Sequence, residues 1–161
     1  MKILAIDPGN TTSGYAVMDG YKPLRHGCAE NDYLLNLLEV GSFEVDAVII
    51  EMVASYGMSV GKEVFETCVW IGRFWQAAKK HSQVDRVYRL DEKVTICHDS
   101  RAKDTNIRQA LIDRFAQHDF KNGKGTKKKP DFFYGFSKDM WAAFAAGVTW
   151  LDMKKEAANE S

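Results

Sequence analysis

Residues 2–20 read KILAIDPGNTTSGYAVMDG, two short apolar segments on either side of a polar turn. Residues 3–7 and 13–18 have the composition of strands, and the Gly/Asn/Thr turn between them favours an antiparallel hairpin. The first predicted strand ends on a carboxylate, Asp7. A charged group at the end of a buried strand requires an explanation.

The composition is that of one globular domain. The chain has 161 residues, of which 45% are apolar and 27% charged, enough for one core. We expect a single domain over residues 1–155 and a disordered tail over 156–161. No apolar run approaches 18 residues and the start lacks the layout of a signal peptide, so we expect a cytoplasmic protein without membrane segments. The odd number of cysteines, without C-x-x-C spacing, argues against a disulfide framework and a zinc site.

The rest of the chain alternates predicted strands and helices. Apolar runs predict further strands at 23–30, 45–51 and 84–90. Apolar residues at helical spacing predict helices at 32–39, 60–80 and 103–115, and a last helix that begins after Ser137 as its N-cap. A three-strand opening followed by this alternation favours an α/β domain, a mixed sheet with helices on both faces.

Three acids are predicted to lie near the carboxyl ends of the strands, where ligands bind in α/β sheets. Asp7 and Glu51 each end a predicted strand, and Asp139 lies in the first turn of the last helix. Small residues follow Asp139 on the same face and let that helix lie close to the sheet: Ala142, Ala143, Ala146 and Gly147.

Neighbouring carboxylates repel one another unless a cation lies between them, and Mg²⁺ or Mn²⁺ suits such oxygen ligands. The three acids therefore predict a metal site for phosphodiester hydrolysis, in which Asp7 on the central strand is the candidate to bridge two ions. Taken singly, each acid has an ordinary alternative role as a turn former or helix cap.

A basic segment precedes the last helix. Residues 121–130, KNGKGTKKKP, hold five lysines and no acid. A solvated loop is the ordinary explanation. The alternative is a mobile loop that contacts the phosphates of a polyanion, with Lys124, Lys127, Lys128 and Lys129 as its contacts.

The ordered set of segments resembles the RuvC-type Holliday-junction resolvases. The hairpin AIDPGNTTSGYAV is similar to the opening of that family, and AVIIE at 47–51 to its second acidic strand. RLDEKVTICHDSRAKDTNIRQAL resembles a family segment with a Lys-Val pair, a loop and a helix, and SKDMWAAFAAG resembles the catalytic last helix. GTKKKPDFFYGFSKD is similar to the phage-encoded branch of these nucleases.

The resemblance implies a fold, an activity and a set of site residues. It implies an RNase H-like five-stranded sheet, three antiparallel strands then two parallel ones, in a homodimer that nicks two strands of branched DNA with Mg²⁺. By position, Asp7, Glu51 and Asp139 are the metal-binding, catalytic carboxylates. Lys103 matches a DNA-contacting lysine of the family, and Lys93 is a second candidate. The setting would be a bacterial or phage-infected cell.

One position departs from the family pattern. The family usually has a second acid three positions after the first in the last helix, where this chain has Ala142. Either three carboxylates suffice or another acid contributes. Asp131 is a poor substitute, because it lies in the loop before the helix.

The loop after Glu51 holds Tyr56 and Met58 on either side of Gly57. In the family this region reaches into the junction, where an aromatic ring can stack on unpaired bases. The alternative is a hydrophobic pair at the dimer interface.

Three other functions remain open from the residues. A sugar-kinase or actin-like ATPase also has a strand-end Asp and a Gly/Thr turn, but needs two such domains, and this chain has length for one. An RNase H-like nuclease on flaps or RNA:DNA hybrids would use the same acids. A branched-DNA-binding module without catalysis is the third, and Ala142 is the residue that supports it.

Overall fold

Five strands and five helices make up the chain in this computed structural model, which describes residues 1–161. The strands are β1 (Lys2–Asp7), β2 (Thr12–Asp19), β3 (Lys22–Glu30), β4 (Ala47–Met52) and β5 (Gln83–Tyr88). The helices are α1 (Asn31–Glu39), α2 (Lys62–Ala78), α3 (Arg89–Cys97), α4 (Asp104–Phe115) and α5 (Lys138–Asn159).

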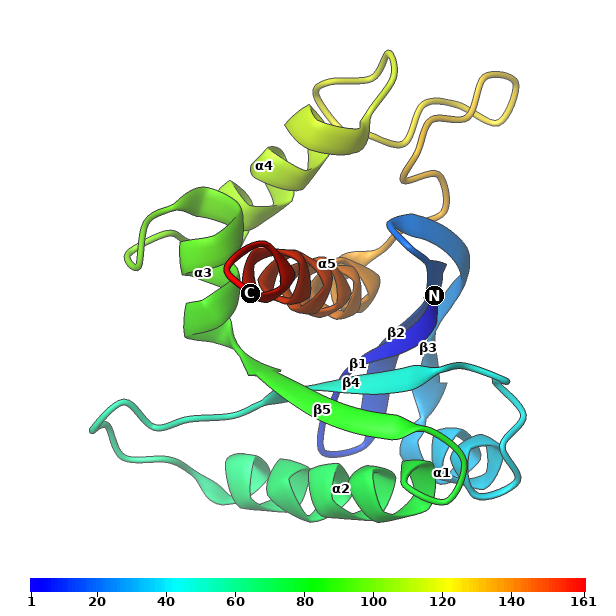
Figure 1. Cartoon of the computed structure of the whole chain (residues 1–161), viewed down its shortest axis with the longest axis vertical. Helices are drawn as coiled ribbons and strands as arrows, with labels where there is room; N and C mark the ends of the chain where they lie inside the picture. Colours follow the sequence, from blue (N-terminus) through cyan, green and yellow to red (C-terminus); the bar gives the residue numbers. More distant parts are fainter.

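The strands form one mixed sheet in the order β3-β2-β1-β4-β5. β1 and β3 both run antiparallel to β2, whereas β4 is parallel to β1 and β5 is parallel to β4. The predicted sheet of three antiparallel and two parallel strands is confirmed. Figure 1 shows α1 and α2 on one side of this sheet and α3, α4 and α5 on the other.

Alternate residues of the strands build two separate cores. Ile3, Ala47 and Ile49 face α5 in the larger apolar cluster, whereas Leu4 and Val48 face α1 and α2 in the smaller one. This period of two decides which side of the sheet each later residue of a strand faces. Odd-numbered residues of β1 and β4, Asp7 among them, therefore face α5.

Helix α5 lies close to the sheet because small residues face it. Ala143, Ala146 and Gly147 are buried as predicted. A Cβ on Gly147 would stand 2.6 Å from the sulfur of Met18 and 3.2 Å from the Cβ of Ala5, so a larger residue there would require Met18 to move. Ala142 differs from the prediction, because it is only half-buried and lies at the edge of a cleft.

Two expectations about local structure were wrong. Residues 89–97 form helix α3 directly after β5, where a strand end and a loop were predicted. The predicted tail at 156–161 is helical as far as Asn159, because α5 continues without interruption. Ser137 is the N-cap residue of α5, but its side chain makes no capping hydrogen bond. None of the five helices combines the length and the apolar character that a membrane span requires.

Candidate active site

Asp7 and Glu51 end two neighbouring parallel strands. β1 and β4 are paired as far as Ile6 and Ile50, so the next residue of each strand brings the two carboxylates side by side. Both face α5, and Glu51 is 9% exposed. The prediction that these two acids meet at the carboxyl ends of neighbouring strands is confirmed by this register.

The turn after Asp7 is fixed by a buried polar pair. The Ser13 hydroxyl donates to Asn31 Oδ1 over 2.6 Å and accepts a hydrogen bond from the Gly9 amide. The Asn31 side-chain amide in turn donates to the Gly9 carbonyl over 2.8 Å. The turn is therefore held from both sides, and with it the position of Asp7 at the end of β1.

A glycine brings the third acid to this strand end. Gly14 on β2 is paired with Asp7, and a Cβ on Gly14 would lie 2.7 Å from the carbonyl carbon of Asp139. Only a residue without a side chain allows the first turn of α5 to lie so close. The Cys28 thiol on β3 is 3.5 Å from Asp139 Oδ2. Asp139 thus lies beside Asp7, although the two are distant in sequence.

Burial raises the pKa of the two strand-end acids. The pKa of Asp7 is raised to about 6 by burial, although the nearby Arg89 acts in the opposite direction. Burial also raises the pKa of Glu51 well above its usual value, and the charges of Glu92 and Asp7 add to that effect. Both carboxylates are therefore held in a place that disfavours their negative charge.

A buried ion pair completes the site, and the sequence analysis did not identify it. Arg89, the first residue of α3, lies 2.8 Å from Glu92 Oε2 and 3.1 Å from Glu51 Oε1. The guanidinium also lies 3.8 Å from the exposed carboxylate of Asp104 at the start of α4. Glu92 is fully buried, and burial raises its pKa to about 8. The sequence pattern does not distinguish Arg89 and Glu92 from surface residues, because charged side chains are ordinarily exposed and helix α3 was not predicted.

The donor set fits a hard divalent cation. Two buried carboxylate oxygens, Glu51 Oε2 and Glu92 Oε1, have no hydrogen-bond partner. When Asp7, Glu51, Glu92 and Asp139 are ionised, four negative charges face the one positive charge of Arg89, and a divalent cation would offset two of the three that remain. Carboxylate oxygens are the ligands that Mg²⁺ prefers. As they stand, however, no three acidic, histidine or cysteine side chains converge closely enough to enclose an ion.

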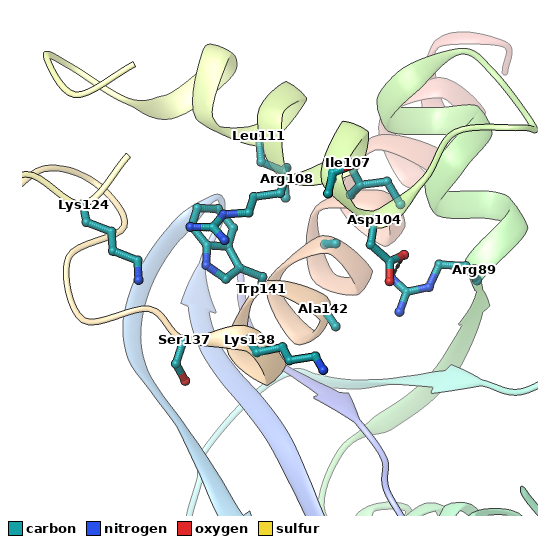
Figure 2. Close-up of a pocket in the computed structure, with 12 residues that line it drawn as sticks. Arg89, Asp104, Ile107, Arg108, Leu111, Lys124, Ser137, Lys138, Trp141 and Ala142 are labelled. Atoms are coloured by element: carbon teal, nitrogen blue, oxygen red, sulfur yellow. Dashed lines mark ion pairs between the residues drawn. The ribbon is translucent and has the colours of Figure 1, made fainter. Parts of the chain in front are cut away.

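A cleft of about 390 Å³ lies between α4 and the start of α5. Arg89, Arg108, Lys124 and Lys138 line it, with Asp104 as its one acid, and Figure 2 shows them around the opening. Its apolar lining comes from both helices: Ile107, Leu111, Trp141, Ala142 and Ala145. The guanidinium of Arg108 covers the ring of Trp141 at 4.7 Å. Ala142 thus faces a cationic cleft in place of a fourth carboxylate.

The basic loop at 121–130 is held at its base by two aspartates. The buried Asp131 accepts hydrogen bonds from four backbone amides, at Gln117, His118, Asp119 and Phe132, and these bonds keep its pKa below the usual value despite burial. Asp119 accepts three more, from Asn122, Lys124 and Gly125. Asp131 is thereby excluded as the missing acid, and the basic loop is tethered at its base.

The other predicted DNA contacts are not among the residues that line the cleft. Lys127, Lys128 and Lys129 are exposed at the tip of the basic loop. Lys103 is exposed at the N-cap of α4, and Lys93 is half-buried on α3. Tyr56 and Met58 are 57% and 72% exposed, in a loop after β4 that Figure 1 shows extending away from the sheet.

Comparisons with known proteins identify the fold. No protein-family model matches the sequence, and no curated protein does so. Among solved structures, Thermus thermophilus RuvC matches with a TM-score of 0.70 at 16% identity, over 98% of this chain and 97% of that one. T. thermophilus RuvC in complex with Holliday junction substrate matches with 0.72 at 15% identity, over 98% and 96%. The yeast mitochondrial Holliday junction resolvase Ydc2 matches with 0.56 at 12% identity, over 98% and 80%.

These similarities confirm the RNase H-like fold over nearly the whole chain. At 12–16% identity the similarities establish the fold alone. One fold can carry many functions, so the function depends on the residues of the site.

Proposed function

We propose that this chain is a metal-dependent endonuclease that resolves Holliday junctions or other branched DNA by paired nicks in two strands. One observation supports it above the others: Asp7 and Glu51 lie side by side at the ends of β1 and β4, with Asp139 brought to them by Gly14. An acidic cluster at that edge, on a fold shared with Holliday-junction resolvases, is suited to phosphodiester hydrolysis.

Asp7, Glu51 and Asp139 are the residues that would hold Mg²⁺, with Mn²⁺ as a substitute. A bound divalent cation supplies positive charge to the attacking and leaving oxygens of the displacement by water. The chain orients these carboxylates through the fixed turn after Asp7 and the close approach of α5 at Gly14. Burial of Glu51 limits the access of bulk water to that side of the site.

The basic residues are suited to hold the DNA backbone beside the acids. Lys124 and Lys138 line the cleft next to Arg89, and the exposed tip of the basic loop extends this positive surface. Lys103 and Lys93 are proposed to add phosphate contacts from the α3–α4 side. Tyr56 and Met58 are proposed to stack on unpaired bases at the branch point, and a place in the dimer interface is their alternative role.

Paired nicks in two strands call for two active sites related by a two-fold axis, so we propose a homodimer. Helix α2 offers an apolar surface for it. Phe65 and Val69 are four residues apart, so they share one face of the helix, and each is 62% exposed. Exposed apolar side chains that gather on one helix face are typical of protein interfaces.

A panel of substrates tests the proposal. The protein is incubated with Mg²⁺ and an end-labelled four-way junction, a flap, an RNA:DNA hybrid or a linear duplex of the same sequence. Cleavage confined to the junction supports the resolvase. Preferential cleavage of the flap or hybrid would keep the acidic site and replace the substrate. Tight junction binding without cleavage in Mg²⁺ or Mn²⁺ would indicate a recognition module.

A further inference from the structure

The side chain of Arg89 contacts the acidic cluster and also lines the cleft. Its guanidinium contacts Glu51 and Glu92 on the buried side and Asp104 on the exposed side. The side chain keeps 28% of its surface exposed and lines the cleft. Figure 2 shows Arg89 and Asp104 facing each other at the edge of that cleft. A ligand in the cleft can therefore reach Arg89 without any change in the core.

Arg89 is the one hydrogen-bond and ion-pair partner of Glu92. It is fully buried, one of its oxygens accepts a hydrogen bond from Arg89 Nη1, and the other has no partner. A buried carboxylate is unfavourable unless it is paired, and an apolar residue of similar volume often stabilises a protein more. The Arg89–Glu92 pair therefore orients the guanidinium and adds little to the stability of the fold.

The guanidinium also has donors left for a ligand. It carries five N–H groups in a planar fork that matches the oxygens of a phosphate. The pairs with Glu92 and Glu51 fix the plane of the fork from behind, beside the carboxylates that would hold the metal. No other hydrogen bond from the guanidinium is made within the protein, and its contact with Asp104 is long, at 3.8 Å.

We propose that Arg89 is a catalytic residue that contacts the phosphate being cut, and that Glu92 is the positioning residue that orients it. The inference rests on the proposed nuclease function and deepens it. Arg89 approaches the phosphate from α3, across a cleft in which Ala142 of α5 provides no carboxylate. On that side the chain itself contributes positive charge to the displacement, in addition to the cation held by the acids.

The alternative is that Arg89 only neutralises the acids and keeps them in place. The two roles differ in their effect on metal binding. A guanidinium that assembles the metal site would weaken metal binding when it is removed. A guanidinium that acts on the phosphate would leave metal binding unchanged or tighter, because a competing positive charge has gone, while cleavage falls.

The test compares Arg89→Met with wild type in two measurements. Single-turnover cleavage of a prebound four-way junction is expected to fall by a factor of about 10² to 10³, the usual effect of removing one transition-state donor. Mn²⁺ binding to the protein alone, followed by electron paramagnetic resonance, is expected to be as tight as in wild type or tighter. Arg101→Met is the matched control, because Arg101 is 91% exposed and its only ion pair is with Asp99.

Two further variants separate this role from a structural one. Arg89→Met/Glu92→Gln removes the charge that the single variant would leave unpaired on the fully buried Glu92, so it is expected to fold even if the single variant does not, and to cut as poorly as Arg89→Met. Glu92→Gln alone is expected to slow the cleavage step without weakening junction binding. In the Arg89→Met background it is expected to have no further effect on the rate, because the two residues act as one unit.

Three results would overturn the inference. The first is wild-type cleavage by a folded Arg89→Met or double variant. The second is a parallel loss of Mn²⁺ binding and cleavage, which would make Arg89 part of the metal site. The third is a wild-type protein that cuts no DNA, and this result alone would overturn the proposed function as well.

Discussion

The backbone of Asp139 lies directly over Gly14, the residue of β2 that is paired with Asp7. There is no room between them for a side chain, because a Cβ on Gly14 would stand 2.9 Å from the Cβ of Asp139. This single contact sets how close the last helix comes to the first strand. It joins the two ends of the chain into one site.

Gly14→Ala is expected to separate α5 from the sheet at its first turn. The added methyl group would overlap backbone atoms, which cannot move aside as a flexible side chain can, so destabilisation of about 1–3 kcal/mol is expected. Mn²⁺ affinity and junction cleavage should both fall, as measured by calorimetric titration and a nicking assay. Gly72→Ala is the matched control, because nothing lies within 4 Å of its added Cβ. Equal Mn²⁺ affinity in both variants would show that Asp139 does not contribute to the metal site.

Asp7→Asn is expected to stabilise the metal-free protein while it abolishes metal-dependent cleavage. The pKa of Asp7 is raised from 3.8 to about 6, so its charge opposes folding at neutral pH by about 3 kcal/mol at most. The amide removes that charge at nearly constant volume. Urea unfolding at pH 8 in EDTA measures the difference, with Asp113→Asn on the exposed surface of α4 as control. A less stable Asp7→Asn protein would contradict the account of the buried charge.

The metal-free protein is expected to lose stability as the pH rises. Asp7 and Glu92 have pKa values of about 6 and 8 in the folded protein, above their ordinary values. The folded state therefore binds more protons than the unfolded state between about pH 4 and pH 8, and the free energy of unfolding falls with pH over that window. Thermal unfolding in EDTA across this range measures the fall.

Mg²⁺ or Mn²⁺ is expected to restore that stability, because the cation binds the ionised carboxylates of the folded state alone. The rise in unfolding temperature on metal addition should accordingly be larger at pH 8 than at pH 5. A metal effect that is independent of pH would place the cation away from these acids.

The tip of the basic loop is expected to contribute to DNA binding through charge. Each of Lys127→Gln, Lys128→Gln and Lys129→Gln that removes a phosphate contact should reduce the slope of log K against log salt by about 0.9. The loop itself should stay folded, because Asp119 and Asp131 hold its base. Lys79→Gln, at the far end of α2, is the control. Unchanged salt slopes in all three variants would remove the loop from the DNA-binding surface.

The exposed face of α2 is expected to hold the dimer together. Phe65→Glu introduces a charge on that face without touching the core, since Phe65 is 62% exposed. Analytical ultracentrifugation should show a dimer for wild type and a monomer for Phe65→Glu, with paired nicks replaced by single ones. Val40→Glu, on a side chain that is 71% exposed after α1, is the control. A Phe65→Glu protein that remains dimeric would move the interface elsewhere.

Much of the fold and three residues of the candidate site were predictable from local sequence patterns. Continuous apolar runs identify β1, β2 and β4, and Asp7 and Glu51 stand at the ends of two of these runs. Small residues at helical spacing show which side of α5 meets the sheet. These are local patterns, and local patterns survive in a single sequence. Gly14 was visible as a glycine in a strand, a sign of close backbone approach, but the identity of its neighbour was not.

The residues that escaped prediction owe their positions to tertiary contacts. α3 begins directly after β5 without a Gly or Pro between them, so nothing in the sequence marks the boundary. Arg89 and Glu92 are charged residues three apart on that helix, and such a pair is ordinarily exposed. They are withdrawn from solvent because α3 packs against α4, α5 and β5. The sequence likewise places Asp131 in a loop, but it does not predict that the side chain is buried and accepts hydrogen bonds from four backbone amides.

The most direct test of the nuclease itself is the position of the cuts in a four-way junction. Each strand is end-labelled in turn and incubated with wild type or Asp7→Asn, in Mg²⁺ and in EDTA. The account predicts nicks at symmetric positions in two opposing strands, present only for wild type with Mg²⁺. Symmetric nicks that persist in EDTA or in Asp7→Asn would contradict the assignment of catalysis to the acids at the ends of β1 and β4.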